Sequence, residues 1–200
     1  MKIAVCISGQ SRSWDNVKEN IIQNIFKDNT DVFFVSDKDL LISDIDHEIT
    51  KELQSFYDES ILGFFNNNKS PETSVESCVN MFYKIFRCNE LKKQYENKHN
   101  FKYDIVVRLR PDTNFKNPVI FSEDKDKIFT SHEFNWGGVC DQFAYGPSDL
   151  MDKFCDLFPN IRKYVEEGRL FHPETLLQYH CDKLGLEIVR QDVGLLGIVR

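Results

Sequence analysis

Apolar residues along this chain alternate between short uninterrupted runs and longer stretches with helical spacing. The short runs at residues 2–8, 31–36 and 103–110 are bounded by polar residues or glycine, which is typical of buried strands. Residues 12–26 lie between the first two runs and repeat apolar side chains at the spacing of a helix that is buried on one face. This succession of strand, helix and strand predicts a right-handed parallel βαβ unit.

The rest of the chain continues the alternation. Residues 40–62 suggest an amphipathic helix, and the asparagine-rich residues 63–72 suggest a loop that serves as a mobile flap. A long helix is predicted from Thr73, because Thr73 and Glu76 have the spacing of a capping box. Further strands are predicted at 127–130, within 142–146, at 186–190 and at 195–200, and further helices from Ser148 to about Glu167 and over 172–185, the last with Pro173 in its first turn and Gly185 as its stop.

These elements predict an α/β fold with a mainly parallel mixed sheet flanked by helices. The length of 200 residues, with 41% of them hydrophobic, favours one domain over residues 1–200. The net charge of −7 argues against nucleic acid as the main partner, since binding a phosphate backbone normally requires a basic surface.

Cysteine usage and the longest apolar runs indicate the compartment. The six cysteines are scattered without a C-x-x-C pair, which favours reduced, mostly buried thiols. The first residues, MKIAVCISG, form too short an apolar run for a signal peptide, and no stretch approaches the roughly 20 residues of a membrane span. We therefore expect a cytoplasmic protein without a transmembrane segment.

The most unusual polar residues follow the central predicted strand in the segment YDIVVRLRPDTNF. Arg108 and Arg110 share one face of that strand, and each needs a carboxylate or a ligand anion if it is buried. Asp112 and Asn114 then follow Pro111 with a D-x-N spacing, which can present two oxygens to a divalent cation. A purely structural network, in which Asp104 or Asp112 pairs with the arginines, is the alternative.

Two other polar clusters also fall at predicted strand ends, where α/β sheets bind their ligands. The segment SGQSRSW places Arg12 where a helix begins, and the backbone amides and dipole there favour a phosphate or a carboxylate. Asp141 follows two glycines and a cysteine, so it is a candidate general base or ligand of a substrate hydroxyl, with an ordinary loop aspartate as the alternative. Glu174 opens a predicted helix, where it either serves the site or complements the helix dipole.

Several of these segments together resemble a known group of proteins. MKIAVCISGQSRSW, DVFFVS, YDIVVRLRPDTNF, CDQFAYG and HPETLLQYH are similar to segments of glycosyltransferase-like proteins from large DNA viruses, phages and bacteria. That group is similar to nucleotide-diphosphate-sugar transferases of the GT-A fold. The resemblance implies a Rossmann-like GT-A domain that transfers a sugar from a nucleotide-diphosphate donor to a hydroxyl of a glycan or small molecule, in the host cytoplasm if the protein is viral.

The resemblance also implies roles for individual residues. Ser8, Gly9, Gln10 and Arg12 would lie by the nucleotide, with Arg108 and Arg110 also on the donor side, and Arg110 and Arg12 could neutralise the leaving diphosphate without a metal. Asp112 and Asn114 would replace the metal-binding D-x-D motif and hold Mn²⁺ or Mg²⁺, although Asn114 lacks the second carboxylate. Asp141 or Glu174 would lie nearest the acceptor hydroxyl.

Two other functions stay open on the sequence. A sulfotransferase-type enzyme would hold its phosphonucleotide donor at SGQSRSW, although that turn has no lysine. A carbohydrate-binding or scaffolding domain would keep the fold without catalysis. Stabilisation by sulfonucleotides, by nucleotide sugars or by glycans alone distinguishes the three functions.

Overall fold

A mixed sheet forms the centre of the protein. The computed structural model describes residues 1–36, 49–53 and 56–199. Its main-sheet strands are β1 (Ile3–Gly9), β2 (Thr30–Ser36), β3 (Ile49–Leu53), β4 (Ile105–Leu109), β6 (Lys127–Ser131), β7 (Phe143–Gly146) and β8 (Glu187–Gln191). Within the described residues these seven strands follow the order β3-β2-β1-β4-β7-β6-β8. Neighbouring strands pair in parallel except at β7, which is antiparallel to both β4 and β6. The predicted α/β class and mainly parallel mixed sheet are therefore confirmed.

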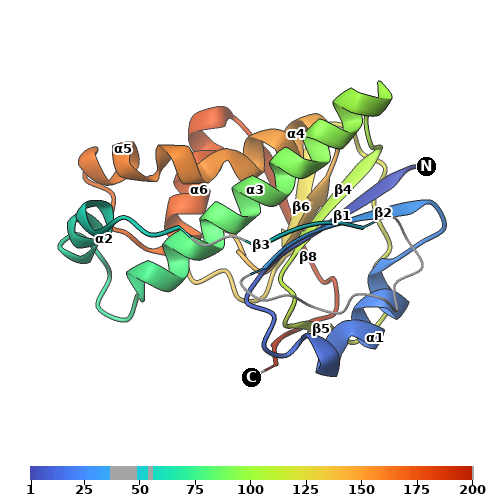
Figure 1. Cartoon of the computed structure of the whole chain (residues 1–200), viewed down its shortest axis with the longest axis horizontal. Coiled ribbons are helices and arrows are strands. Elements are labelled where there is room, and N and C mark those ends of the chain that lie inside the picture. Colours follow the sequence, from blue (N-terminus) through green and yellow to red (C-terminus); the bar gives the residue numbers. More distant parts are fainter. Residues whose placement is uncertain (37–48, 54–55, 200) are drawn as a thin grey trace.

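Helices cover both faces of this sheet (Figure 1). On one face α1 (Trp14–Ile25) packs its buried residues against Ile3, Val5 and Ile7 of β1. The other face is crossed by the long helix α3 (Val75–His99), with α4 (Ser148–Phe154) and α6 (Pro173–Leu184) beside it. The same side also carries α2 (Glu59–Asn66), the 3₁₀ helix η1 (Cys155–Asn160) and α5 (Ile161–Glu166).

The alternation of side chains along β1 explains why its apolar run has no polar gaps. Ala4 and Cys6 point to the core under α3, whereas Ile3, Val5 and Ile7 point to the core under α1. Every residue of β1 is buried, as expected for a parallel strand that helices cover on both sides. The same alternation places Arg108 and Arg110 of the β4 segment on the α3 side.

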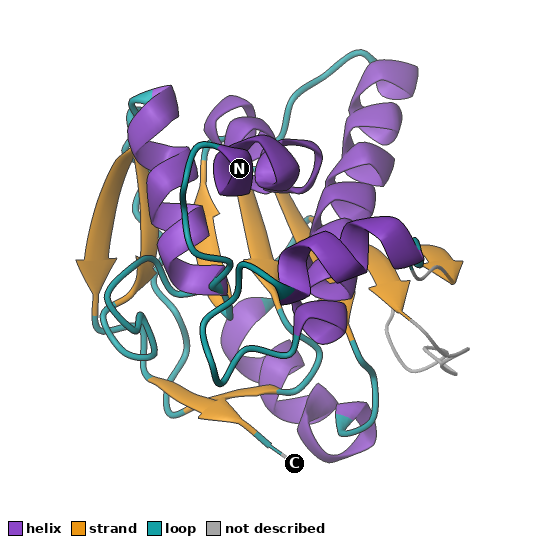
Figure 2. Cartoon of the chain, turned by 90° about the vertical axis from the view of Figure 1, so that its left-hand side faces the viewer, coloured by secondary structure: helices purple, strands orange, loops and turns teal. Residues whose placement is uncertain are grey.

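A second, small sheet lies beyond the carboxyl end of β4. It pairs β5 (Thr113–Phe115) with β9 (Leu195–Ile198) in antiparallel register, apart from the main sheet and close to the C-terminal end in Figure 2. The amide of Val199 also donates to the carbonyl of Asp112 at 2.8 Å. Residues 195–199 are thereby fixed beside the end of the central strand.

Four details differ from the pattern-based predictions. Residues 49–53 form a strand rather than a helix, because they pair in parallel with β2, and the rest of 40–55 lies outside the described residues. The expected loop at 63–72 begins only after α2 ends at Asn66. The predicted helix from Ser148 to about Glu167 is interrupted by η1, which contains Pro159.

The fourth difference concerns the start of α3. Ser74, and not Thr73, occupies the cap position, and its side chain makes no capping hydrogen bond to the backbone. Its hydroxyl instead donates to the hydroxyl of Ser77 at 3.0 Å. The predicted Thr73–Glu76 capping box is therefore wrong, although the helix itself is confirmed.

A buried ionic cluster joins α3 to α4 near the start of β4. The Lys92 ammonium group donates to Glu96, Ser148 and Asp152 at 3.0, 2.6 and 2.6 Å. Glu96 also accepts from the amide of Tyr103 at 3.0 Å, so each charge in this cluster has partners. The cluster ties α3 and α4 to the amino end of β4.

Two further predictions concern the state of the cysteines and the lack of a transmembrane segment. All six cysteines are free and five of them are buried, as predicted. No helix in the described part of the chain is both long enough and apolar enough to cross a membrane.

Candidate functional site

A cleft of about 460 Å³ opens at the carboxyl edge of the main sheet. It is built from the turn after β1, the first turns of α3, the end of β4, the loop before β7 and the start of α6. The sequence-predicted residues that line it are Gly9, Gln10, Arg12, Arg110, Asp141 and Glu174. The fold thus brings three separate polar segments of the sequence to one place, as the rule for open α/β sheets predicts.

The turn after β1 depends on Gly9. Its φ angle of +145° lies in a region that side chains rarely adopt, and a Cβ atom there would meet Cδ of Pro111 at 3.0 Å. This close contact lets the ends of β1 and β4 lie side by side. Gln10 and Arg12 then extend into the exposed rim of the cleft.

Arg110 is held in one orientation by Asp112. Its Nε donates to Oδ1 of Asp112 at 2.9 Å and its Nη2 donates to Oδ2 at 2.8 Å. Asp112 is fully buried, whereas one fifth of the Arg110 side chain remains accessible in the cleft. Two fixed bonds to a buried carboxylate orient a planar guanidinium before any ligand arrives.

The predicted pair of metal ligands is not assembled at Asp112 and Asn114. Both carboxylate oxygens of Asp112 already accept from Arg110, and Asn114 lies on β5, opposite Gly197, outside the lining of the cleft. Among the described residues no group of three or more His, Cys, Asp or Glu side chains is placed to hold an ion. These positions do not fit Mn²⁺ or Mg²⁺ ligation, and metal dependence stays a prediction.

Arg108 lies one step deeper on the same face of β4. Only 1% of it is exposed, and none of its three guanidinium nitrogens has a hydrogen-bond partner among the described residues. Asp104, the predicted partner, lies at the other end of β4 and accepts from the amide of Lys2 at 2.8 Å, so the predicted pairing with Asp104 or Asp112 is wrong for Arg108. Burial lowers the pKa of Arg108, and the negative charge of Asp141 opposes this effect.

Ser8 does not reach the cleft either. It is fully buried at the end of β1, and its hydroxyl oxygen has no hydrogen-bond partner in the part of the chain that the structure describes. The register of the strands places it beside Arg110, on the face that α3 covers. Of the four residues predicted to lie by a nucleotide, Gly9, Gln10 and Arg12 line the cleft and Ser8 does not.

Two carboxylates come together from different elements. Asp141 precedes β7 and Glu174 lies in the first turn of α6, and each is 7% exposed. Burial, together with the charge of Asp141, raises the pKa of Glu174 to about 7. Its Oε2 lies 3.3 Å from Nδ1 of His172 without the alignment of a hydrogen bond. One carboxyl of this pair is therefore poised to exchange a proton near neutral pH.

Cys78 also lines this part of the cleft. Burial and the charges of Asp141 and Glu174 raise the pKa of its thiol to about 12. The thiol is therefore protonated at neutral pH, which makes it a poor nucleophile.

The segment before Asp141 is packed directly against α6. The amide of Val139 donates to the carbonyl of Glu174 at 3.1 Å. A Cβ atom on Gly138 would lie 2.0 Å from that same carbonyl oxygen, so only glycine fits there. This backbone contact is what sets the two carboxylates beside each other.

Sequence reasoning missed the contribution of α3. Ser77, Asn80 and Lys84 line the cleft, and their spacing of three and four residues places them on one face of the helix. Gln142, which follows Asp141, lines it as well. A polar stripe along an otherwise core-forming helix was the signal that would have revealed the first three.

Comparison with known sequences places the chain in a family. A search of curated proteins found no match. The family described as "Domain of unknown function (DUF7796)" matches residues 1–152, which include Arg110 and Asp141 but not Glu174. Since this match spans most of the chain, the protein belongs to the DUF7796 family.

Proposed function

We propose that this protein is a glycosyltransferase with a GT-A-like fold, which moves a sugar from a nucleotide-diphosphate donor to a hydroxyl acceptor. One observation carries the proposal: a single cleft at the carboxyl edge of the sheet holds an oriented arginine and two buried carboxylates whose charges interact. The reaction needs both features, because it releases an anionic diphosphate and removes a proton from the acceptor.

The charges of the cleft favour a phosphorylated ligand. Arg12, Lys84 and Arg110 contribute positive side chains to its lining, although the whole chain carries a net charge of −7. A neighbouring hollow of about 340 Å³ shares Gln10 and Lys84 with the cleft and adds the aromatic rings of Phe56 and Tyr57. We place the diphosphate at the cationic side chains and the nucleoside near these rings, where a base can stack.

Arg110 is the residue that we expect to stabilise the transition state. Negative charge grows on the departing diphosphate as the bond to the sugar breaks. A guanidinium that Asp112 already holds in place stabilises this growing charge without reorganising, and therefore lowers the barrier. In this role Asp112 positions Arg110 and does not touch the donor.

Glu174 is the stronger candidate for the general base. A base works best when its pKa lies near the working pH, and Glu174 has a pKa of about 7. Asp141 supports this role, because its negative charge raises the proton affinity of Glu174. A base that deprotonates the acceptor for direct attack on the sugar would give inversion at the anomeric carbon.

The proposal is tested by donor binding and by turnover. A thermal-shift panel of nucleotide sugars, each with and without Mn²⁺, is expected to yield at least one donor that raises Tm. With that donor, Arg110→Ala is expected to lower turnover about a hundredfold or more, and Asp141→Asn to impair transfer with little effect on donor affinity. Arg162→Ala, which removes an exposed arginine paired with Glu166, is the matched control.

Three outcomes would contradict the proposal. The first is a panel in which no nucleotide sugar changes Tm. The second is wild-type turnover in Arg110→Ala, which would remove this cleft from the reaction. The third is stabilisation by a sulfonucleotide alone, which would favour a sulfotransferase-type activity.

A further inference from the structure

A second hollow of about 460 Å³ lies on the other side of the first turn of α6. Glu174 lines the first cleft, and its neighbour Thr175 lines the second hollow. Gly137 lines the second hollow as well, one residue from the Gly138 backbone that touches Glu174. The first turn of α6 and the Gly138 backbone therefore separate the two spaces.

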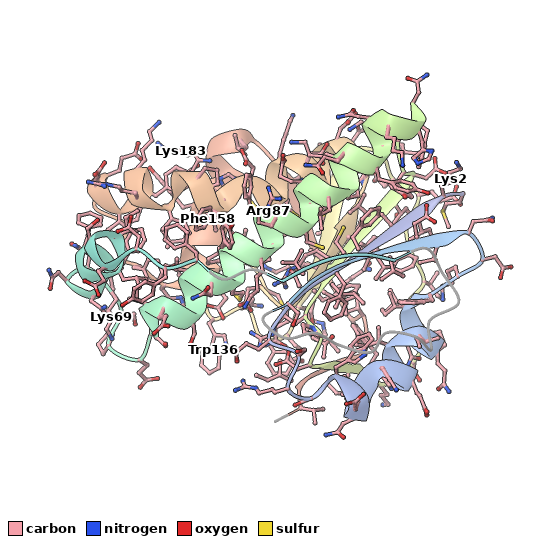
Figure 3. All side chains as sticks on the ribbon, viewed as in Figure 1. Lys2, Lys69, Arg87, Trp136, Phe158 and Lys183 are labelled. Atoms are coloured by element: carbon pink, nitrogen blue, oxygen red, sulfur yellow. The ribbon has the colours of Figure 1, made fainter. Side chains whose placement is uncertain are left out.

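Trp136 directly precedes Gly137, which lines this hollow, and its side chain is exposed to solvent. It is 73% exposed, and Figure 3 shows its side chain projecting away from the ribbon. Its φ angle is +41°, and Phe134 and Gly137 on either side have φ angles of +56° and +80°. A backbone held in such sparsely populated conformations, displaying a large exposed ring, indicates a function for that ring.

The loop that carries Trp136 is fixed at several points. The Asn135 side chain donates to the carbonyl of His132 at 2.6 Å, and the Gly138 amide donates to the carbonyl of Asn135 at 2.6 Å. Arg190 of β8 donates to the carbonyl of Gly138 at 2.9 Å. The ring is therefore presented from a braced loop, so little conformational entropy is lost when a ligand stacks on it.

The wall of the hollow offers planar polar groups in a fixed arrangement. Arg190 donates to Oε1 of Gln178 at 2.6 Å, and Nε2 of Gln178 donates to Oδ1 of Asp182 at 2.7 Å. The guanidinium of Arg169 lies 4.1 Å from the ring centre of Tyr179. A hollow that contains an oriented carboxylate and begins one residue from an exposed aromatic ring suits a saccharide, which presents hydroxyl groups at its edge and an apolar C–H surface on its face.

We propose that Trp136 and the hollow lined by Gly137, Thr175, Gln178 and Asp182 bind a pyranose ring of a saccharide acceptor. The pyranose stacks on the Trp136 ring, and Asp182 accepts hydrogen bonds from its hydroxyl groups. The acceptor role rests on the proposed function, whereas saccharide binding does not depend on it. The acceptor class is thereby narrowed from any hydroxyl compound to a carbohydrate.

Tryptophan fluorescence tests this proposal directly. The chain has two tryptophans, and Trp14 is only 1% exposed, so aqueous iodide quenches Trp136 selectively. Titration with methyl pyranosides, maltose, cellobiose and lactose is expected to protect Trp136 from iodide for at least one of them. For that saccharide, Asp182→Asn is expected to weaken binding about tenfold, the effect of losing one good polar contact.

Transfer assays and donor binding provide the controls. Trp136→Ala is expected to raise KM for the acceptor about tenfold or more, while Trp136→Phe retains most of the stacking and stays near wild type. Neither substitution is expected to change the Tm increase produced by the nucleotide sugar. Trp136 is exposed, so both variants are expected to fold.

Each outcome separates this inference from the proposed function. If a nucleotide sugar binds but no saccharide protects Trp136, and Trp136→Ala transfers like wild type, the inference is overturned and the transferase stands. If a saccharide protects Trp136 and no nucleotide sugar binds, the hollow is a carbohydrate site and the transferase proposal fails. Protection that persists unchanged in Asp182→Asn would overturn the assignment of that carboxylate.

Discussion

Arg108 and Arg110 point to the same face of β4, yet they meet opposite environments. Arg110 is paired through two hydrogen bonds with Asp112 and remains partly accessible, whereas Arg108 is buried without a hydrogen-bond partner. A buried, unpaired guanidinium destabilises a folded protein, so its presence beside a cleft is better explained by function than by stability. Its positive charge interacts with the negative charge of Asp141.

Replacing Arg108 by an uncharged residue of similar length tests whether the buried guanidinium lowers stability and serves function. We expect Arg108→Met to raise the free energy of unfolding by about 1 to 4 kcal/mol in urea denaturation, because a buried charge is replaced by apolar contacts. The same variant is expected to lose donor turnover, and Arg108→Lys, which keeps the charge, should show no gain in stability. A destabilised Arg108→Met would instead indicate that the guanidinium has a partner such as a buried water.

Glu174 predicts a specific pH dependence of transfer. A general base must be deprotonated, and burial together with Asp141 raises the pKa of Glu174 to about 7. The rate is therefore expected to increase about tenfold per pH unit below pH 7 and to become constant above it. Glu174→Gln should abolish this limb and most of the rate. A pH profile in Glu174→Gln that still rises through pH 7 would assign the base to another group.

At the scale of elements, the site depends on how the loop before β7 meets the start of α6. Gly138 and Glu174 touch through their backbones, so the relative position of the two elements sets the distance between the two carboxylates. Arg190 of β8 strengthens this contact by bonding both Gly138 and Gln178 of α6. The proposed catalytic pair therefore relies on α6, on β8 and on a loop that lies far from both in the sequence.

Two alanine substitutions distinguish this contact from simple backbone strain. Gly138→Ala places a methyl group 2.0 Å from the Glu174 carbonyl oxygen, so it must displace α6 and is expected to lower both Tm and transfer strongly. Gly137→Ala meets no atom within 4 Å and carries only the strain of φ +80°, about 1 to 2 kcal/mol. Equal activity in the two variants would show that the contact does not position Glu174.

Element prediction succeeded where burial alone decides the pattern. The strand predictions for β1, β2 and β4 are confirmed, because a strand that is covered on both faces needs apolar residues throughout. Residues 49–53 were misread, because their conformation comes from pairing with β2 and their own spacing resembles that of a helix. Pairing with a distant strand is not encoded in a local pattern.

At the scale of the whole molecule, the family match and the folded unit have different lengths. Residues 1–152 carry the match, but α6 and β9 lie beyond it. Phe171, Leu176 and Leu177 belong to the core on the α3 side, and Leu195 belongs to the core on the α1 side. The segment after residue 152 therefore completes both cores as well as the proposed site.

Truncation tests this dependence. A chain of residues 1–152 is expected to lose cooperative unfolding, because removal of α6 exposes buried apolar side chains and β5 loses its partner β9. Circular dichroism during thermal unfolding should show a sharp transition for residues 1–200 and none for the truncated chain. A cooperative transition in the shorter chain would show that the matched part folds independently.

Most strands and helices, and the edge of the sheet that carries the site, follow from the sequence alone, because burial imposes periods of 2 and 3.6 residues and parallel strands end at a common edge. The partners of individual side chains do not follow from it. That Asp112 is bound by Arg110, that Asn114 lies outside the cleft and that Glu174 meets Asp141 depend on contacts between segments far apart in the chain. Such contacts are fixed by the packing of α3 and α6 on the sheet, and no local spacing of residues specifies them.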